Sequence, residues 1–235
     1  MSIYISASSL KDYIECSQKV YYRLDKQVVQ TQTREMHIGL VTHSILEHGW
    51  RDLDTACDLL DSKLVSENLT KADAELVYGF IRTFFESFRP YIGDNDLIEY
   101  KFKVKLQDGV YLVGKMDRIS DGNVYDWKTT ARPPKSISDD VQFMLYESAY
   151  RTVFKESPKS VAYASLSQGK FIPYVSNKHY EYEVFNKIIP NMIRDMRSGN
   201  YFREGIFRSK CYRCPYKEVC LDGVNDELDY SEFAS

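Results

Sequence analysis

The spacing of hydrophobic residues changes once along the chain and separates a helical part from a part that contains strands. Up to residue 88, apolar side chains recur every three or four positions. This spacing predicts helices over residues 6–22, 39–50, 53–64 and 71–88, with a polar loop over residues 31–35. From residue 98 to residue 106, apolar residues alternate with charged ones, which is typical of a strand with one buried face.

The rest of the chain combines short strands with helices. Asp121 and Gly122 are a strong signal for a two-residue turn, so we expect a hairpin around them. A second hairpin is expected over residues 161–175, and helices are expected over residues 139–154 and 179–197, the latter kinked or broken at Pro190. This order of elements predicts a mixed α/β core with a helical N-terminal elaboration.

The first hairpin places two carboxylates face to face. With a two-residue turn, Ser120 lies across from Asn123, and the same count places Asp117 across from Asp126. Opposed carboxylates repel each other, so a sheet built only for stability would avoid them. A divalent cation such as Mg²⁺ would bind both, and Lys128 would point toward the same ion. The alternative is an exposed hairpin whose charges face water.

This set of residues suits phosphodiester hydrolysis. Two carboxylates supply a metal site, and a lysine beside it can steady the developing negative charge or position the attacking water. Strand alternation places Lys115 and Lys128 on the face of the two aspartates, and Arg118 and Trp127 on the opposite face.

Two further motifs are candidates for the same site. His43 lies on an apolar helical face, where a lone histidine is more often a core residue than a ligand, with Glu47 one turn on. Gln142 and Tyr146 are one turn apart, so they share a face of the helix expected over residues 139–154. In isolation, an ordinary polar edge of an amphipathic helix explains the two residues better than a site does.

The cysteines form a third candidate site. Cys211, Cys214 and Cys220 are clustered in a polar segment, and Cys16 is a better fourth ligand than Cys57, which lies among helical residues. Four cysteines fit either tetrahedral Zn²⁺ or an iron–sulfur cluster, and their spacing is compatible with both. The chain has no basic and apolar leader and no apolar run near the ~18 residues that cross a bilayer, so we expect a cytoplasmic protein with no membrane contact.

Composition narrows the possible functions only slightly. The chain has 235 residues, 43% of them hydrophobic, which is enough for one substantial domain. Its net charge of −3 gives no global basic field that would indicate nucleic acid. Near the C-terminal cysteines, however, cations alternate with aromatic residues, which suits single-stranded DNA or, alternatively, a solvated helix face. These residues are Lys187, Arg194, Arg197, Tyr201, Phe202, Arg203, Phe207, Arg208, Lys210, Tyr212, Arg213 and Lys217.

Six motifs, in this order, resemble the PD-(D/E)XK nuclease superfamily and, within it, the RecB-like exonuclease family associated with CRISPR systems. They are Cys16 after a Ser-rich helix start, Gly39 with His43, Gly114 with Asp117, Asp126 with Lys128, Gln142 with Tyr146, and the three C-terminal cysteines. Met116 stands where the superfamily name has proline, a departure that removes no ligand.

The resemblance implies a restriction-endonuclease-like α/β (α+β) fold, with a central mixed sheet flanked by helices. It implies that His43, Asp117 and Asp126 bind Mg²⁺ or Mn²⁺ and that Lys128 is the catalytic lysine. Glu99 is a looser match to an upstream acidic residue that assists the site in related nucleases. Further implications are that Gln142 and Tyr146 contact DNA or support the site, and that Cys16, Cys211, Cys214 and Cys220 hold a [4Fe–4S] cluster.

We therefore expect one nuclease domain over residues 1–235. Its parts would be a helical segment over residues 1–95, a nuclease core over residues 96–200, and a cysteine segment with an acidic tail over residues 201–235. The expected activity is a metal-dependent exonuclease acting on single-stranded DNA or DNA ends. The alternatives are a DNA-end-processing component of CRISPR spacer acquisition that works with an integrase complex, and a DNA-repair nuclease with structural zinc in place of the cluster.

Overall fold

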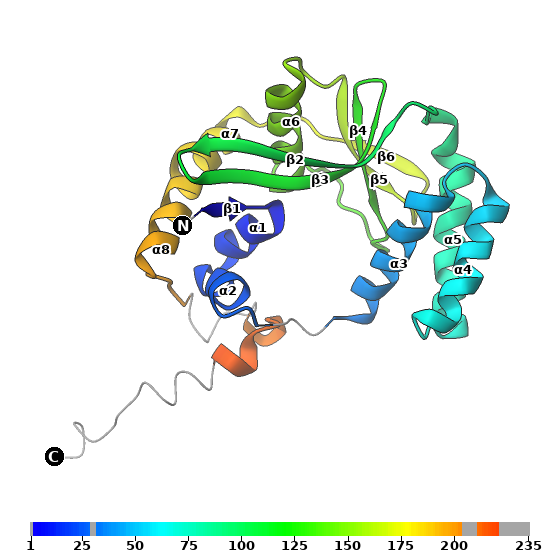
Figure 1. Ribbon diagram of the computed structural model, residues 1–235, viewed down its shortest axis with the longest axis horizontal. Helices are drawn as coiled ribbons and strands as arrows, with labels where there is room; N and C mark the ends of the chain where they lie inside the picture. Colours follow the sequence, from blue (N-terminus) through cyan, green and yellow to red (C-terminus); the bar gives the residue numbers. More distant parts are fainter. Residues whose placement is uncertain (1, 29–31, 204–210, 221–235) are drawn as a thin grey trace. The chain divides into compact units, whose positions relative to one another are not determined.

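The computed structural model describes residues 2–28, 32–203 and 211–220 (Figure 1). The chain divides into two compact units, which are described separately. The first unit comprises Met1–Ala7 and Gln32–Glu183, and the second comprises Ser8–Thr31 and Val184–Ser235. None of the described helices is long and apolar enough to cross a membrane. The expectation of a single nuclease domain stays a prediction.

The first unit contains a six-stranded mixed sheet and most of the helices. Its strands are β1 (Ile3–Ile5), β2 (Leu97–Gln107), β3 (Val110–Ser120), β4 (Asn123–Lys128), β5 (Ser160–Ser165) and β6 (Lys170–Pro173). Its helices are α3 (Arg34–Gly49), α4 (Leu53–Ser66), α5 (Lys71–Ser87), a 3₁₀ turn (Arg89–Tyr91), α6 (Val141–Phe154) and α7 (Lys178–Glu183). The strand order is β1-β3-β4-β5-β6, with β2 also paired to β3. The pairs β1/β3 and β4/β5 are parallel, and the others are antiparallel.

Helices cover both faces of this sheet (Figure 1). Trp127 of β4 packs edge-on against Phe84 of α5, with ring centroids 5.2 Å apart, and belongs to a buried cluster shared by α3, α4 and α5. The preceding residue, Asp126, bonds instead to Gln142 of α6. Since successive strand residues point to opposite faces, α5 and α6 lie on opposite sides of β4. The strand faces predicted for the first hairpin are therefore confirmed at this position.

The second unit contains shorter helices. They are most of α1 (Ala7–Glu15), then α2 (Ser17–Val20), a π-helix (Tyr21–Asp25), a second π-helix (Val184–Ile188), α8 (Ile189–Ser198) and a 3₁₀ turn (Cys211–Arg213). The helix expected over residues 6–22 is interrupted at Cys16, whose backbone is extended, with φ −170° and ψ 115°. No break occurs near Pro190, because the π-helix Val184–Ile188 leads directly into α8, in whose first turn Pro190 lies, and Ile188 is itself helical; a kink at this position stays a prediction.

One expected helix start was wrong, and one strand was not predicted. α3 begins at Arg34, inside the expected loop, because Thr33 caps it by accepting a hydrogen bond from the Met36 N–H at 3.3 Å. The strand β1 was not predicted, because three residues are too few to show a period. It is defined by its parallel pairing with β3, from Ile3 with Val110 onward.

Candidate active site

The first hairpin has the register that its turn residues predict. Ser120 pairs with Asn123 across the turn formed by Asp121 and Gly122. Both turn residues have positive φ, 45° and 77°, as a type I′ turn requires. The turn therefore fixes which residues of β3 and β4 come near each other.

β3 and β4 separate where the two aspartates lie. The last pair of the ladder is Arg118 with Tyr125, one pair before the aspartates. Beyond it, the side chain of Asp117 accepts a hydrogen bond of 2.8 Å from the backbone N–H of Trp127. Asp117 and Asp126 thus lie on the two arms of a fork in the sheet, with only 6% and 2% of their surfaces exposed.

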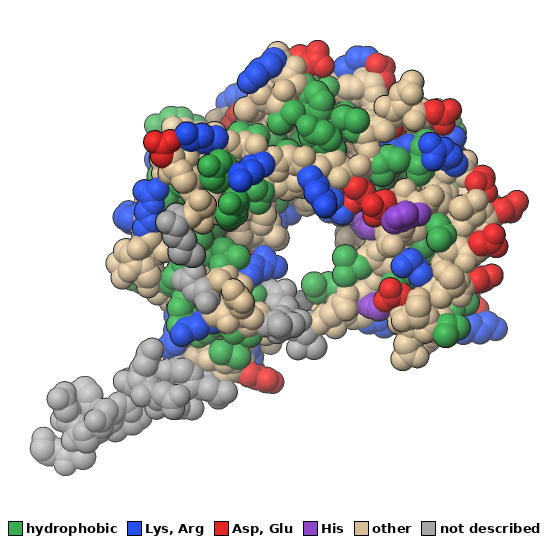
Figure 2. All heavy atoms as spheres, in the orientation of Figure 1, with side chains coloured by type: hydrophobic (Ala, Val, Ile, Leu, Met, Phe, Trp, Pro, Cys, Tyr) green, Lys and Arg blue, Asp and Glu red, His purple; other side chains and the backbone are tan. Residues whose placement is uncertain are grey.

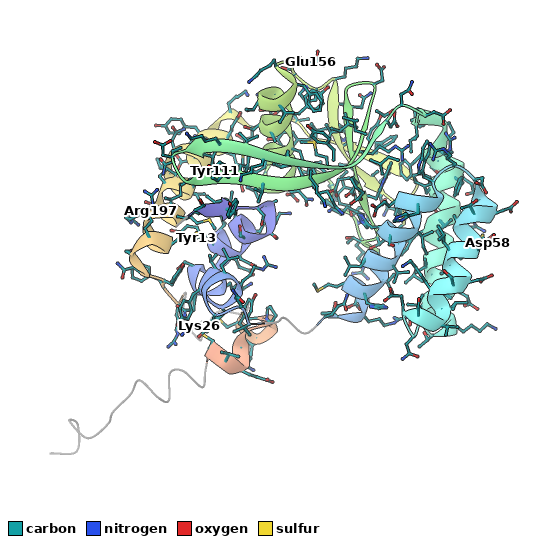
Figure 3. All side chains as sticks on the ribbon, in the orientation of Figure 1. Tyr13, Lys26, Asp58, Tyr111, Glu156 and Arg197 are labelled. Atoms are coloured by element: carbon teal, nitrogen blue, oxygen red, sulfur yellow. The ribbon has the colours of Figure 1, made fainter. Side chains whose placement is uncertain are left out.

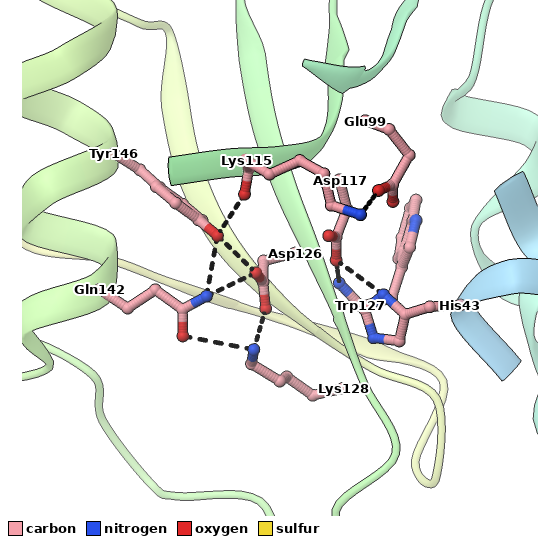
Figure 4. Close-up of polar contacts among 9 residues, drawn as sticks. All are labelled: His43, Glu99, Lys115, Asp117, Asp126, Trp127, Lys128, Gln142 and Tyr146. Atoms are coloured by element: carbon pink, nitrogen blue, oxygen red, sulfur yellow. Dashed lines mark hydrogen bonds and ion pairs between the residues drawn. The ribbon is translucent and has the colours of Figure 1, made fainter. Parts of the chain in front are cut away.

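Asp126 is held by side chains from β4 and α6 (Figure 4). Its Oδ1 accepts a hydrogen bond of 2.8 Å from Gln142 Nε2 and lies 3.0 Å from the Tyr146 hydroxyl. Its Oδ2 forms an ion pair of 2.5 Å with Lys128. The Tyr146 hydroxyl also lies 2.7 Å from the backbone carbonyl of Lys115 on β3. The two residues that share a face of α6 therefore converge on one carboxylate and bridge the fork.

The two aspartates differ in acidity. Burial raises the pKa of Asp126, and the nearby charge of Asp117 adds to this, so the attraction of Lys128 is outweighed. Burial also acts to raise the pKa of Asp117, but His43 and Lys128 outweigh it, and the pKa of Asp117 lies below its usual range. The pKa of Lys128 is raised, because Asp126 outweighs the effect of burial. The fork therefore contains two carboxylates of unequal pKa beside a firmly protonated lysine.

His43 of α3 and Glu99 of β2 approach Asp117 and form a candidate metal centre. Nδ1 of His43 lies 3.4 Å from Asp117 Oδ2. Each of three residues, His43, Glu99 and Asp117, offers one ligand atom, and these atoms lie within 4.8 Å of one another. Among the residues that the structure describes, no other set of three possible metal ligands is this close. A nitrogen and two carboxylates can bind Mg²⁺ or Mn²⁺. Asp126 is not in this group and is engaged by Lys128 instead.

Glu99 reaches the group through an unusual backbone conformation. Its φ is 50°, in the left-handed region that a glutamate in a strand rarely adopts. The pairs on either side of it, with Arg118 and Met116, place it across from Asp117. Its carboxylate also forms an ion pair with Lys115. The alternating pattern of β2 gave no sign of this conformation, which explains why the sequence left Glu99 as a loose match.

Gly114 is required by close packing rather than by a turn. A Cβ at this position would lie 2.5 Å from Cζ of Phe102, closer than nonbonded carbon atoms approach, so the Phe102 ring would have to shift. The Phe102 ring in turn meets Tyr146 edge-on, with centroids 6.2 Å apart. The glycine of the Gly114–Asp117 motif thus lets a ring from β2 support the tyrosine that contacts Asp126.

The opposite face of the hairpin is anchored by a buried ion pair. Arg118 is 1% exposed, and its Nε donates a hydrogen bond of 2.9 Å to Asp96 Oδ2. Its guanidinium lies 3.9 Å from the centroid of the Trp50 ring at the C-terminal end of α3. This contact fixes β3 against the helix that supplies His43.

The four cysteines expected to bind a metal all lie in the second unit. Each is half-buried and forms no disulfide, whereas Cys57 lies in α4 of the first unit. Burial raises the pKa of the Cys214 thiol, although a backbone hydrogen bond and Lys19 oppose this, and among the described residues no three of the thiols lie within 4.8 Å of one another. The backbone N–H of Cys214 donates to the carbonyl of Cys211 at 3.1 Å.

Part of the predicted basic and aromatic segment cannot be placed. Phe207, Arg208, Lys210, the Arg213 side chain and the acidic tail over residues 222–232 lie outside the described residues. Single-strand binding by this segment therefore stays a prediction.

Comparisons with known proteins agree with this geometry. The chain matches the model of the PD-(D/E)XK nuclease superfamily over residues 4–221. No curated protein matches it by sequence. Among solved structures, a candidate exonuclease from Eubacterium rectale is similar, with a TM-score of 0.63 over 89% of this chain and 87% of that chain. The two are 16% identical, so this likeness concerns the fold alone. The predicted fold class, a central mixed sheet flanked by helices, is confirmed.

Proposed function

The chain belongs to the PD-(D/E)XK nuclease superfamily, and we propose that it is a deoxyribonuclease that acts as an exonuclease on single-stranded DNA or DNA ends. The observation that carries this proposal is the fork between β3 and β4, where two buried carboxylates, Asp117 and Asp126, meet Lys128. A buried set of this kind costs stability, and phosphodiester hydrolysis is the chemistry that uses it.

The side chains divide the work of hydrolysis among them. His43, Glu99 and Asp117 would hold the divalent ion, which would neutralise charge on the phosphoryl oxygens and lower the pKa of a bound water. Lys128, kept protonated beside Asp126, would bind the oxygens on which negative charge develops as water adds to phosphorus and the P–O bond breaks. Gln142 and Tyr146 would keep Asp126 and Lys128 in position.

Digestion of end-labelled DNA tests the activity. Purified protein with Mn²⁺ or Mg²⁺ is expected to release mononucleotides from labelled single strands, and EDTA is expected to stop the release. Cleavage of a circular single strand, which has no ends, would overturn the assignment as an exonuclease. It would still support the assignment as a nuclease. Intact DNA after incubation with either ion would overturn both.

The position of the ion gives a prediction of its own. Glu99→Gln is expected to weaken Mn²⁺ binding by on the order of ten-fold, because the variant removes one charged oxygen ligand from the group around Asp117. Isothermal titration measures the affinity, and Glu86→Gln, on the exposed surface of α5, is the matched control. If only Asp126→Asn weakens binding, the ion lies between Asp117 and Asp126 instead.

The same proposal assigns a [4Fe–4S] cluster to Cys16, Cys211, Cys214 and Cys220, with structural Zn²⁺ as the alternative. Both groups take four thiolates. What supports the assignment is that all four cysteines lie in one compact unit, together with the extended break at Cys16 that separates α1 from α2. The ligands come from both ends of the second unit, so the metal would join segments that are almost two hundred residues apart.

Replacing one of these ligands is expected to remove the metal. Cys214→Ser should bring bound iron to background and abolish the broad visible absorbance of the purified protein, because three thiolates hold the cluster poorly. Iron, sulfide and zinc analyses on anaerobically purified protein measure the outcome, with Cys57→Ser as the control. A colourless wild-type protein that contains zinc would decide for the alternative.

The link to CRISPR systems remains a prediction from the sequence motifs. In that role the protein would process DNA ends for an integrase complex and show little activity alone. Co-purification with an integrase, together with weak digestion by the isolated protein, would favour it over free turnover.

A further inference from the structure

A surface of exposed lysines, with one exposed and one half-buried tyrosine, runs along β2 and β3 toward the fork. Lys101 of β2 lies directly across from Lys115 of β3. Tyr111 of β3 lies across from Lys105 and, on its other side, beside Tyr4 of β1. Residues across from one another point to the same face of a sheet. With Lys103, which contacts both tyrosine rings, they form a surface that we call the lysine–tyrosine strip, composed of Tyr4, Lys101, Lys103, Lys105, Tyr111 and Lys115.

The strip ends at the candidate metal centre. Tyr111 and Asp117 are six residues apart on the same strand, a distance of roughly 20 Å at the rise of an extended chain. Lys115, at the near end, forms an ion pair with Glu99. Figure 2 shows Lys and Arg side chains at intervals along the β2–β3 ribbon, leading to a group of acidic and histidine side chains, and Figure 3 labels Tyr111 on this ribbon.

The lysines of the strip are poorly neutralised. Lys101 and Lys115 are directly opposed cations, an arrangement that destabilises a sheet. Lys105 and Lys115 each pair with a carboxylate, but Lys101 and Lys103 form no ion pair with any residue that the structure describes. Since the whole chain carries a net charge of −3, this local excess is not a general property of its surface. A bound polyanion would relieve the repulsion.

The tyrosines add a surface for stacking. The rings of Tyr4 and Tyr111 stack with centroids 5.6 Å apart and an angle of 21° between their planes. Tyr4 is 47% exposed, and Nζ of Lys103 lies 4.2 Å from the Tyr111 ring centroid. Exposed aromatic faces beside lysines are the combination with which proteins bind unpaired bases and the backbone that links them.

Protection of a sheet edge does not account for the whole strip. Lysines on edge strands hinder pairing between sheets, and this suits Lys101, Lys103 and Lys105 of β2. It suits Lys115 as well, because β3 is paired there with β2 alone, its ladders with β1 and β4 covering only residues 110–112 and 118–120. It does not explain the stacked pair of the exposed Tyr4 and the half-buried Tyr111, since an apolar ring at an edge would favour association rather than prevent it.

We propose that the lysine–tyrosine strip binds a single strand of DNA and guides it to the fork at Asp117. The proposal rests on the proposed function and adds to it the path of the substrate. Its physical content is that phosphates lie along Lys101, Lys103 and Lys115 while unpaired bases stack on Tyr4 and Tyr111.

Binding without cleavage tests the strip. Fluorescence anisotropy of labelled oligodeoxythymidylate with the full-length protein, in EDTA and at several salt concentrations, gives the affinity and its salt dependence. The double variant Lys101→Ala/Lys103→Ala is expected to bind about ten-fold more weakly. The plot of log affinity against log salt concentration should also become less steep by about 1.4, because each lost phosphate contact reduces the slope by about 0.7. Tyr111→Leu is expected to lose roughly ten-fold in affinity with little change in the salt slope.

The controls separate the strip from the nuclease proposal. Lys170→Ala, on the exposed face of the opposite edge strand β6, should bind like the wild type. Unchanged affinity in both strip variants, or equal competition by a blunt duplex, overturns the strip. The nuclease proposal is then untouched, because metal-dependent digestion and its loss in Asp126 variants decide it. Conversely, the wild-type protein could digest no DNA and yet bind it through the strip. That result would overturn the proposed nuclease activity and support the proposed role of the strip in binding.

Discussion

Asp126→Asn is expected to lower the rate of metal-dependent DNA hydrolysis by about a hundred-fold or more and to leave the protein folded. Asparagine keeps the oxygen that accepts a hydrogen bond from Gln142, but it removes the negative charge that faces Lys128 at 2.5 Å. Because burial raises the pKa of Asp126, the folded protein carries this charge at a cost. The thermal midpoint of the variant is therefore not expected to fall below that of the wild type.

Initial rates of nucleotide release from end-labelled single-stranded DNA with Mn²⁺ measure the first effect, and thermal unfolding followed by circular dichroism measures the second. Asp58→Asn, on the exposed side of α4, is the matched control and should retain the wild-type rate. Rates in Asp126→Asn within a few-fold of the wild type would mean that the fork is not the site of cleavage.

Asp96→Ala is expected to lower the free energy of unfolding by about 3–5 kcal/mol, the largest effect on stability that we predict. Arg118 is only 1% exposed, and Asp96 is the only carboxylate that pairs with its guanidinium among the described residues. The substitution therefore leaves a buried cation without a partner charge. The Trp50 ring, 3.9 Å away, attracts the cation but cannot replace a negative charge. Urea unfolding at constant ionic strength measures the loss.

A second substitution distinguishes an unpaired charge from lost packing. If the penalty comes from the isolated cation, the double variant Asp96→Ala/Arg118→Met is expected to be more stable than Asp96→Ala alone, since methionine fills the space without charge. A double variant that is less stable than the single one would contradict this explanation. Glu86→Ala removes an exposed ion pair with Arg82 and should cost about 0.5 kcal/mol or less.

The parts of the site that the sequence predicts are those that depend on local geometry. The turn at Asp121 and Gly122 determines the register of β3 and β4, and spacing by one helical turn places Gln142 and Tyr146 on one face of α6. Both relations are set by neighbours within a few residues. Alternation along β4 likewise places Asp126 and Trp127 on opposite faces.

The parts that the sequence does not predict depend on contacts between distant segments. Glu99 joins the candidate metal centre from a position on β2 across from Asp117 and with a positive φ, and nothing in the alternating pattern of β2 indicates that φ value. Arg118 contacts Asp96 and Trp50, which lie on two other segments of the chain. No periodic pattern of residues along the sequence indicates that these three segments meet. The Cys16 break likewise contradicts a helical pattern that continues on both sides of it.

The hydrogen bond from the Trp127 N–H to Asp117 gives one carboxylate two tasks. The Asp117 carboxylate links β3 to β4 at the point where the backbone hydrogen bonds between them stop. The same carboxylate faces His43 as a candidate metal ligand. An inactive Asp117 variant would therefore confound loss of chemistry with loosening of the strands. Asp126 accepts no bond from the backbone in the described contacts, so Asp126→Asn is the better inactive protein for trapping a complex with DNA.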